Sequence, residues 1–92
     1  MNSIEVAKKV VEEQSALLFR RRKNNTVVND KIVPDYDVKE PFSGKKKGWV
    51  YLDHFSASAI MACYNALSPE NQKKAPQLSI ISWVDFAFKH VK

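Results

Sequence analysis

The chain has 92 residues, of which 45% are hydrophobic and 27% are charged. This length fits one domain, and this composition is too apolar for a chain that is disordered throughout. We therefore expect a single domain over residues 1–92.

The single cysteine, Cys63, excludes a disulfide within the chain and favours a reducing compartment, so we expect a cytoplasmic protein. Charged residues interrupt the N-terminal segment, and no apolar run approaches the roughly 18 residues that a bilayer span needs, so we expect neither secretion nor contact with a membrane.

The chain carries 15 Lys and Arg against 10 Asp and Glu, a net charge of +5. Seven of the 15 cations lie in two short clusters, 20–23 and 45–47. Local basic patches attract polyanions and acidic protein surfaces. The alternative is that one cluster is a solvated helix end and the other a flexible charged loop, and both interpretations stay open at this point.

The first predicted helix covers residues 3–22. Asn2 and Glu5 have the spacing of a capping box. Seven apolar residues then share one arc of roughly 160° at helical spacing: Ile4, Val6, Ala7, Val10, Val11, Leu17 and Leu18. The last turn of this helix would carry Arg20, Arg21, Arg22 and Lys23, where the negative end of the helix dipole favours cations.

Residues 24–48 lose the helical period and are rich in turn-forming residues. We expect an irregular, partly mobile insert. Residues 26–28 and 31–33 flank Asn29 and Asp30, which tolerate left-handed backbone, so a small hairpin fits within the insert. The segment 43–48, SGKKKG, has no apolar side chain.

An extended segment at 49–52 leads to Asp53, which is a good N-cap for a second helix. Apolar residues occupy nearly the whole circumference of this helix, so we expect it to be central and covered on several sides. These residues are Phe55, Ala57, Ala59, Ile60, Met61, Ala62, Cys63, Tyr64, Ala66 and Leu67.

Ser68, Pro69 and Glu70 predict the start of a short helix, which must end near Ala75 because Pro76 disfavours helical geometry before it. A last helix opens at Gln77 or Ser79. One arc of this helix is apolar and predicted to be buried: Ile80, Ile81, Trp83, Val84, Ala87, Phe88 and Val91. Phe86 points the other way and is a candidate contact with a partner or a second copy.

The predicted fold class is therefore mainly α. Three main helices and one short helix form a small domain, with an irregular or hairpin-containing insert between the first two.

No catalytic or metal-binding pattern is evident. His54 and His90 are far apart in sequence, and no group of Cys, His and carboxylates has metal-ligand spacing. Cys63 falls on the predicted buried face, where a thiol behaves as a small hydrophobe. The spacing around Gly44 and Gly48 matches no phosphate-binding loop. We expect no enzyme activity, no cofactor and no metal.

Nucleic-acid binding is the alternative function, because the helices around residues 53–90 imitate a helix-turn-helix and the basic clusters suit phosphates. The exposed side of the last helix, however, offers few of the Arg, Asn and Gln residues that contact base edges.

The tract "YLDHFSASAIMACYNALSPENQKK", followed by "WVDFAFK", resembles a segment of small uncharacterised bacteriophage proteins. The resemblance covers about residues 49–91 and rests on packing residues. It implies a phage origin and a compact helical module, and no particular activity.

We therefore expect a non-enzymatic protein that binds and modulates a host protein with an acidic surface, in the host cytoplasm. The predicted partner-binding residues are Arg20, Arg21, Arg22, Lys23, Lys45, Lys46, Lys47 and Phe86. The same cations would serve a DNA- or RNA-binding protein. A homodimer stays open, because each predicted helix has a wide apolar face.

Overall fold

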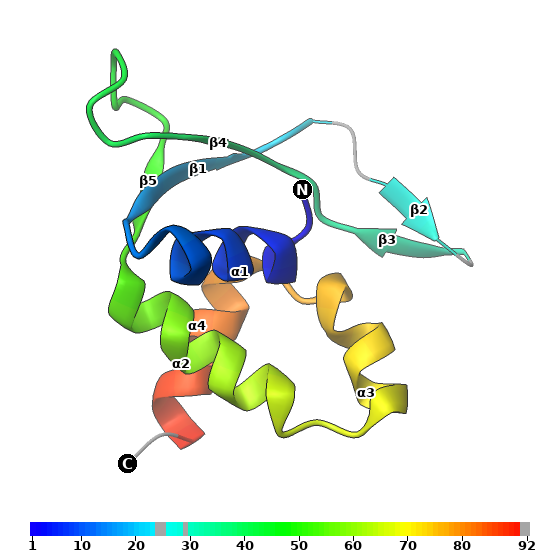
Figure 1. The fold of residues 1–92 in the computed structure, drawn as a ribbon. Coiled ribbons are helices and arrows are strands. Elements are labelled where there is room, and N and C mark those ends of the chain that lie inside the picture. The colour runs from blue at the N-terminus through cyan, green and yellow to red at the C-terminus, as the bar shows by residue number, and fades with distance from the viewer. Residues whose placement is uncertain (24–25, 29, 91–92) are drawn as a thin grey trace.

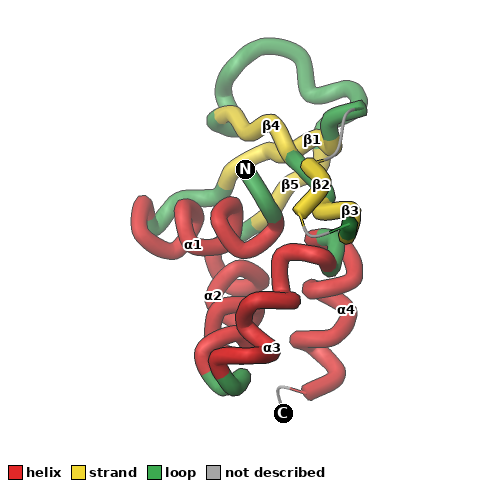
Figure 2. Tube along the Cα trace, turned by 90° about the vertical axis from the view of Figure 1, so that its right-hand side faces the viewer, coloured by secondary structure: helices red, strands yellow, loops and turns green. Residues whose placement is uncertain are grey.

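A computed structural model describes residues 1–23, 26–28 and 30–90, and the side chains of Thr26, Val28 and His90 lie outside that description. The helices are α1 (Ser3–Glu13), α2 (His54–Asn65), α3 (Pro69–Lys74), the 3-10 turn η1 (Ala75–Gln77) and α4 (Ile80–His90). The strands are β1 (Leu17–Arg21), β2 (Thr26–Val28), β3 (Lys31–Val33), β4 (Tyr36–Lys39) and β5 (Val50–Leu52). A three-stranded antiparallel sheet lies on one side of the molecule and the helices on the other (Figures 1 and 2).

The prediction of a mainly α fold is wrong, because the first helix ends nine residues before the predicted boundary. The capping box forms as predicted, with Glu5 N–H donating to Asn2 Oδ1 at 2.9 Å and Asn2 N–H donating to Glu5 Oε1 at 2.9 Å. However, α1 ends at Glu13, and Gln14 adopts a left-handed backbone with φ 51° and ψ 36°. The chain then reverses into β1.

Strand β1 is the centre of the sheet, which has the order β4-β1-β5. Leu17, Leu18 and Phe19 are all at least 96% buried, because both faces of this strand are covered. In a strand that is covered on both faces, apolar residues follow one another in the sequence instead of alternating with polar ones. Leu17 and Leu18 therefore fitted the apolar arc of a longer helix equally well.

Strand β4 was missed at the sequence level, because residues 34–39 contain proline and two aspartates that resemble turn chemistry. In the structure its side chains alternate. Tyr36 is buried and Val38 packs against the core, while Asp37 and Lys39 project from the other face. Phe19 and Tyr36 meet edge to face in the core, with ring centroids 5.6 Å apart.

The hairpin in the insert forms as predicted, with β2 and β3 paired from Thr26↔Val33 to Val28↔Lys31. Asp30 adopts the expected positive φ, 63°. Asn29, the other predicted turn residue, and Asn24 and Asn25 lie outside the described residues. Val33 is buried against the helical side of the molecule, while Ile32 is exposed.

The predicted starts of the three later helices are confirmed. Asp53 caps α2 by accepting from Ser56 N–H at 2.8 Å, and Ser68 caps α3 with Pro69 in its first turn. Ser79 Oγ accepts from Ser82 N–H at 3.1 Å at the start of α4. The extended segment before Asp53 is β5.

The predicted burial of α2 and α4 is only partly right. On α2, Ala57, Ala59 and Ile60 are buried, but Phe55 is 69% exposed, so this helix is not covered all round. On α4, Ile80, Trp83 and Ala87 are buried, whereas Ile81 and Phe88 are exposed. Val91 lies outside the described residues.

Two buried hydrogen bonds fix α4 beneath the sheet. Ile80 N–H donates to the Tyr36 hydroxyl at 3.0 Å, and Trp83 Nε1–H donates to the Ala75 carbonyl at 2.9 Å. The first bond joins β4 to the first turn of α4, where a helix leaves backbone N–H groups without internal partners.

We predict that Tyr36→Phe lowers the free energy of unfolding by about 1–3 kcal/mol, because it leaves the buried Ile80 N–H without its acceptor. Tyr51→Phe is the matched control, since the Tyr51 side chain is exposed and its loss of a hydroxyl should be nearly neutral. Urea unfolding of both variants measures the difference. Equal midpoints would show that the Tyr36 hydroxyl does not hold α4.

A second prediction concerns pH. Ser56, through its side chain and its backbone N–H, holds the pKa of Asp53 below its ordinary value. A lowered folded-state pKa stabilises the fold above the ordinary carboxyl pKa of about 3.9, and that stability is lost as pH falls through the folded-state value. Asp53→Asn keeps a capping amide but cannot titrate. At neutral pH we expect the free energy of unfolding of the wild type to exceed that of Asp53→Asn by a few tenths to about 1 kcal/mol, because the ionised carboxylate interacts with the helix dipole. In acid this difference should disappear. Unfolding measured from neutral pH to acid checks this, and a gap independent of pH would contradict it.

Candidate basic interface

The Trp49 ring has two cations over it, one from the predicted arginine cluster and one from the end of β4. The guanidinium carbon of Arg20 lies 4.5 Å from the centroid of the Trp49 ring, and Lys39 Nζ lies 4.4 Å from it. Arg20 comes from β1, Lys39 from the end of β4, and Trp49 from the residue before β5. Cations are attracted to the electron-rich face of an indole within about 6 Å. This arrangement draws all three strands of the sheet together around one aromatic ring.

The segment that connects β4 to β5, residues 40–49, is named here the basic loop. It projects beyond the sheet, away from the helices (Figures 1 and 2). Ser43 N–H donates to the Glu40 carbonyl and Trp49 N–H to the Lys46 carbonyl, each at 3.0 Å, and Lys39 Nζ donates to the Lys45 carbonyl. The loop is thus tied to β4 at the point where its lysines begin.

The basic loop combines charge with an exposed aromatic ring. Phe42 is 88% exposed, the highest exposure among the large apolar side chains that the structure describes. Lys45, Lys46 and Lys47 follow it and are exposed. Within the described residues these lysines form no ion pair. The loop therefore offers three free cations and an unburied ring to a partner.

The arginine cluster lies on β1 and just beyond it, not on a helix end, so the helix dipole does not account for it. Two of its members are paired with acids of the neighbouring strand region. Arg20 lies 3.4 Å from Asp37, and Arg22 lies 3.4 Å from Asp35 and 3.5 Å from Asp37. Arg21 and Lys23 are exposed and have no ion pair among the described residues. Arg20–Lys23 and Asp37 line an open hollow of about 470 Å³.

The predicted contact residue Phe86 does not belong to this surface. It lies on α4, among the helices, and meets the Trp83 ring edge-on with centroids 5.6 Å apart. Figure 2 shows α4 in the half of the molecule opposite the basic loop. Of the eight predicted residues, Arg20 is the one that contacts the basic loop, through the Trp49 ring. Arg20–Lys23 gather around the hollow beside Asp37, Lys45–Lys47 lie on the loop, and Phe86 lies apart from both groups.

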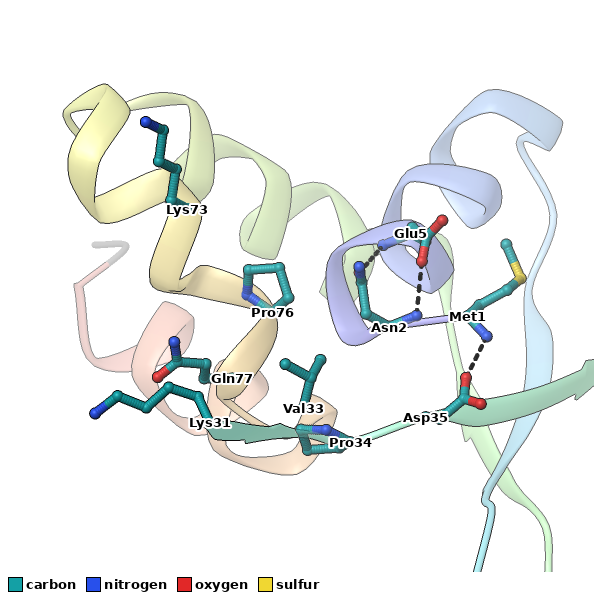
Figure 3. Close-up of a pocket in the computed structure, with 10 residues that line it drawn as sticks. All are labelled: Met1, Asn2, Glu5, Lys31, Val33, Pro34, Asp35, Lys73, Pro76 and Gln77. Atoms are coloured by element: carbon teal, nitrogen blue, oxygen red, sulfur yellow. Dashed lines mark hydrogen bonds and ion pairs between the residues drawn. The ribbon is translucent and has the colours of Figure 1, made fainter. Parts of the chain in front are cut away.

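A second hollow, of about 430 Å³, lies where the start of α1 meets β3 and η1 (Figure 3). Its two carboxylates are already engaged. Glu5 completes the α1 capping box, and Asp35 accepts from the Met1 amino group at 2.6 Å. That ammonium group is the main cause of an Asp35 pKa below the ordinary value. Lys31 and Lys73 extend from the other end of the hollow (Figure 3), so its polar groups do not converge on one point.

The remaining candidates for chemistry stay dispersed. His54 Nδ1 lies 3.4 Å from Ser58 Oγ of the same helix, and Cys63 is half-buried rather than fully buried. In the part of the chain that the structure describes, no three His, Cys, Asp or Glu side chains gather in a way that suits a metal ion. Over the same residues, the helices are too short or too polar to cross a bilayer.

Sequence reasoning missed Lys39 and Phe42 as parts of this surface, and it did not predict that the Trp49 ring would contact Arg20 and Lys39. Lys39 and Trp49 had a detectable signal, since they flank the lysine segment at both ends. In the structure this segment crosses over β1 from β4 to β5, and its flanking residues meet at the Trp49 ring. Phe42 had no such signal, because exposure of a single phenylalanine depends on the loop conformation.

Comparison with known proteins adds no relative: no family model, no curated protein and no solved structure matches this chain.

We predict that Lys39→Gln loosens the basic loop. The change removes a cation from the Trp49 ring and the donor to the Lys45 carbonyl. Loss of about 1 kcal/mol of local stability should raise the rate of tryptic cleavage at Lys45–Lys47 about fivefold. Lys8→Gln is the control, because Lys8 only pairs with Glu12 on the surface of α1. Unchanged cleavage in Lys39→Gln would show that Lys39 does not anchor the loop.

Proposed function

We propose that this chain is a non-enzymatic binding protein whose basic loop and adjacent arginines dock on an acidic, partly apolar protein surface. The observation that carries the proposal is Phe42, which is 88% exposed on a loop whose three lysines form no ion pair with any residue that the structure describes. Burying a phenylalanine contributes about 1.5–3 kcal/mol, and cations around it supply steering and orientation. Interfaces of this kind combine an aromatic anchor with a charged rim.

Two features favour a protein over a nucleic acid as the partner. Asp35 and Asp37 lie between the arginines, and their carboxylates repel a phosphate backbone. Trp49 already has Arg20 and Lys39 over its ring, which makes it a poor platform for stacking a base. Nucleic-acid binding by the same cations is the alternative.

The resemblance of residues 49–91 to small bacteriophage proteins supports a host protein as the partner, with modulation of that protein as the outcome. The single cysteine supports action in the host cytoplasm.

The proposal is tested with three defined probes of equal charge. One is an acidic peptide in which leucines interrupt the glutamates, the second has serines in place of the leucines, and the third is a single-stranded oligodeoxynucleotide. We expect the leucine peptide to bind most tightly at physiological ionic strength. Phe42→Ser should remove that preference, with a loss of about tenfold. Fluorescence anisotropy measures each affinity.

Charge variants complete the test. Lys45/Lys46/Lys47→Gln should weaken binding of all three probes, whereas Lys31/Lys73/Lys74→Gln removes the same charge from other exposed positions and should have little effect. Tighter binding of the oligonucleotide, with a steep logarithmic salt dependence and no effect of Phe42→Ser, would contradict the proposal and favour the nucleic-acid alternative.

A further inference from the structure

The edge of β5 carries an exposed apolar surface that is separate from the lysines of the basic loop. Four of the large apolar side chains that are exposed in the described structure gather there: Val50, Phe55, Ile81 and Phe88. Ile81 is 60% exposed and Phe88 44%, and the Phe88 ring stacks on Phe55 with centroids 5.8 Å apart. Val50, Ile81 and Phe88 line a groove of about 390 Å³ between β5, the first turn of α2 and α4. Soluble monomers rarely expose a contiguous apolar patch of this kind without a partner.

The two edges of the sheet differ. On the outer edge of β4, Tyr36 N–H donates to the Met1 carbonyl at 2.8 Å, and the Met1 amino group donates to the Tyr36 carbonyl at 3.1 Å. On β5, among the described residues, Val50–Leu52 form backbone hydrogen bonds only with β1. One edge is therefore partly occupied, and the edge beside the groove is free to accept another strand.

The charge of the groove decides what kind of partner fits. Asp85 is the one ionisable acid or base other than tyrosine among its lining residues, and it is paired with Lys89 at 3.0 Å. The groove is thus close to neutral and does not suit the acidic partner proposed for the basic loop. A second copy of this chain brings the same neutral apolar surface, the same free edge and the same Asp85–Lys89 pair. Two copies of this surface can therefore meet without charge repulsion within the groove and without burying an unpaired charge.

We propose that the groove and the β5 edge form a two-fold interface with a second copy of this chain. In the dimer β5 pairs antiparallel with β5 of the second copy, and the exposed faces of the two α4 helices pack together beneath the joined sheets. Since the β4 edges are partly occupied, the assembly closes at two copies rather than extending as a filament.

Sedimentation velocity over a range of concentrations tests the interface. We expect a concentration-dependent dimer in the wild type, and a rise of about tenfold or more in its dissociation constant for Ile81→Glu and for Phe88→Glu. Both positions are exposed in the single chain, so the variants should fold. Ile32→Glu is the matched control, since Ile32 is 61% exposed on the separate hairpin. A wild type that stays monomeric, or a dimer that Ile32→Glu weakens as much as Ile81→Glu, overturns the proposal.

Hydrogen exchange of the wild type gives an independent measurement that needs no variant. Amides of Val50–Leu52 that face the free edge should become more protected as protein concentration rises, while those of the hairpin should not.

The dependence on salt separates this inference from the proposed function. Added salt weakens binding of acidic probes to the basic loop, but it strengthens or leaves unchanged a neutral contact between two chains of charge +5. A dimer that dissociates with added salt, or edge amides insensitive to concentration, overturns the inference and leaves the basic-loop proposal untouched.

Discussion

The arrangement of this protein depends on the burial of three consecutive residues, Leu17, Leu18 and Phe19. In a strand, neighbouring side chains point to opposite faces, so burying all three requires cover on both faces of β1. Leu17 and Phe19 join the core formed with α1, α2 and α4. Leu18 faces the other way, and its register partners are Lys39 of β4 and Tyr51 of β5. The aliphatic stem and the ring of such residues can cover a leucine while their polar ends stay in water.

From this constraint the position of the basic surface follows. Because β4 and β5 both run antiparallel to β1, they run parallel to each other, and the basic loop crosses over β1 from the end of β4 at Lys39, opposite Leu18, to the start of β5 at Val50, opposite Phe19. Arg20 emerges next to Leu18 on the outer face and reaches Trp49 at the far end of that loop. Arg20 and Lys39, which are 19 residues apart in the sequence, thereby meet at one ring. The acids Asp35 and Asp37 limit the charge of this surface at the arginines, so the loop lysines carry most of the free positive charge.

Much of the local structure could be predicted from the sequence, because capping residues act within one turn of where they stand. Asn2, Asp53 and Ser68 each begin a helix as expected, and the hairpin at 26–33 forms around Asp30. What failed was the choice between helix and strand at 17–22. That choice depends on whether β4 and β5 are present to cover and pair with the segment, and no periodicity within residues 3–22 carries this information. The error then propagated to the fold class.

The prediction that α2 and α4 would be buried on most of their apolar surface failed for a similar reason, because burial also depends on residues outside the helix itself. An apolar helix surface predicts that something covers it, but not whether the cover comes from the same chain. Phe55, Ile81 and Phe88 satisfy the apolar pattern of buried residues and yet remain exposed. If a second copy covers them, the apolar pattern predicts burial in the dimer correctly and burial in the single chain incorrectly.

A two-fold dimer through β5 would also carry two basic loops on one joined sheet. A partner with two acidic sites could then bind both loops, and the second contact would form at a high effective concentration without any new residue being needed.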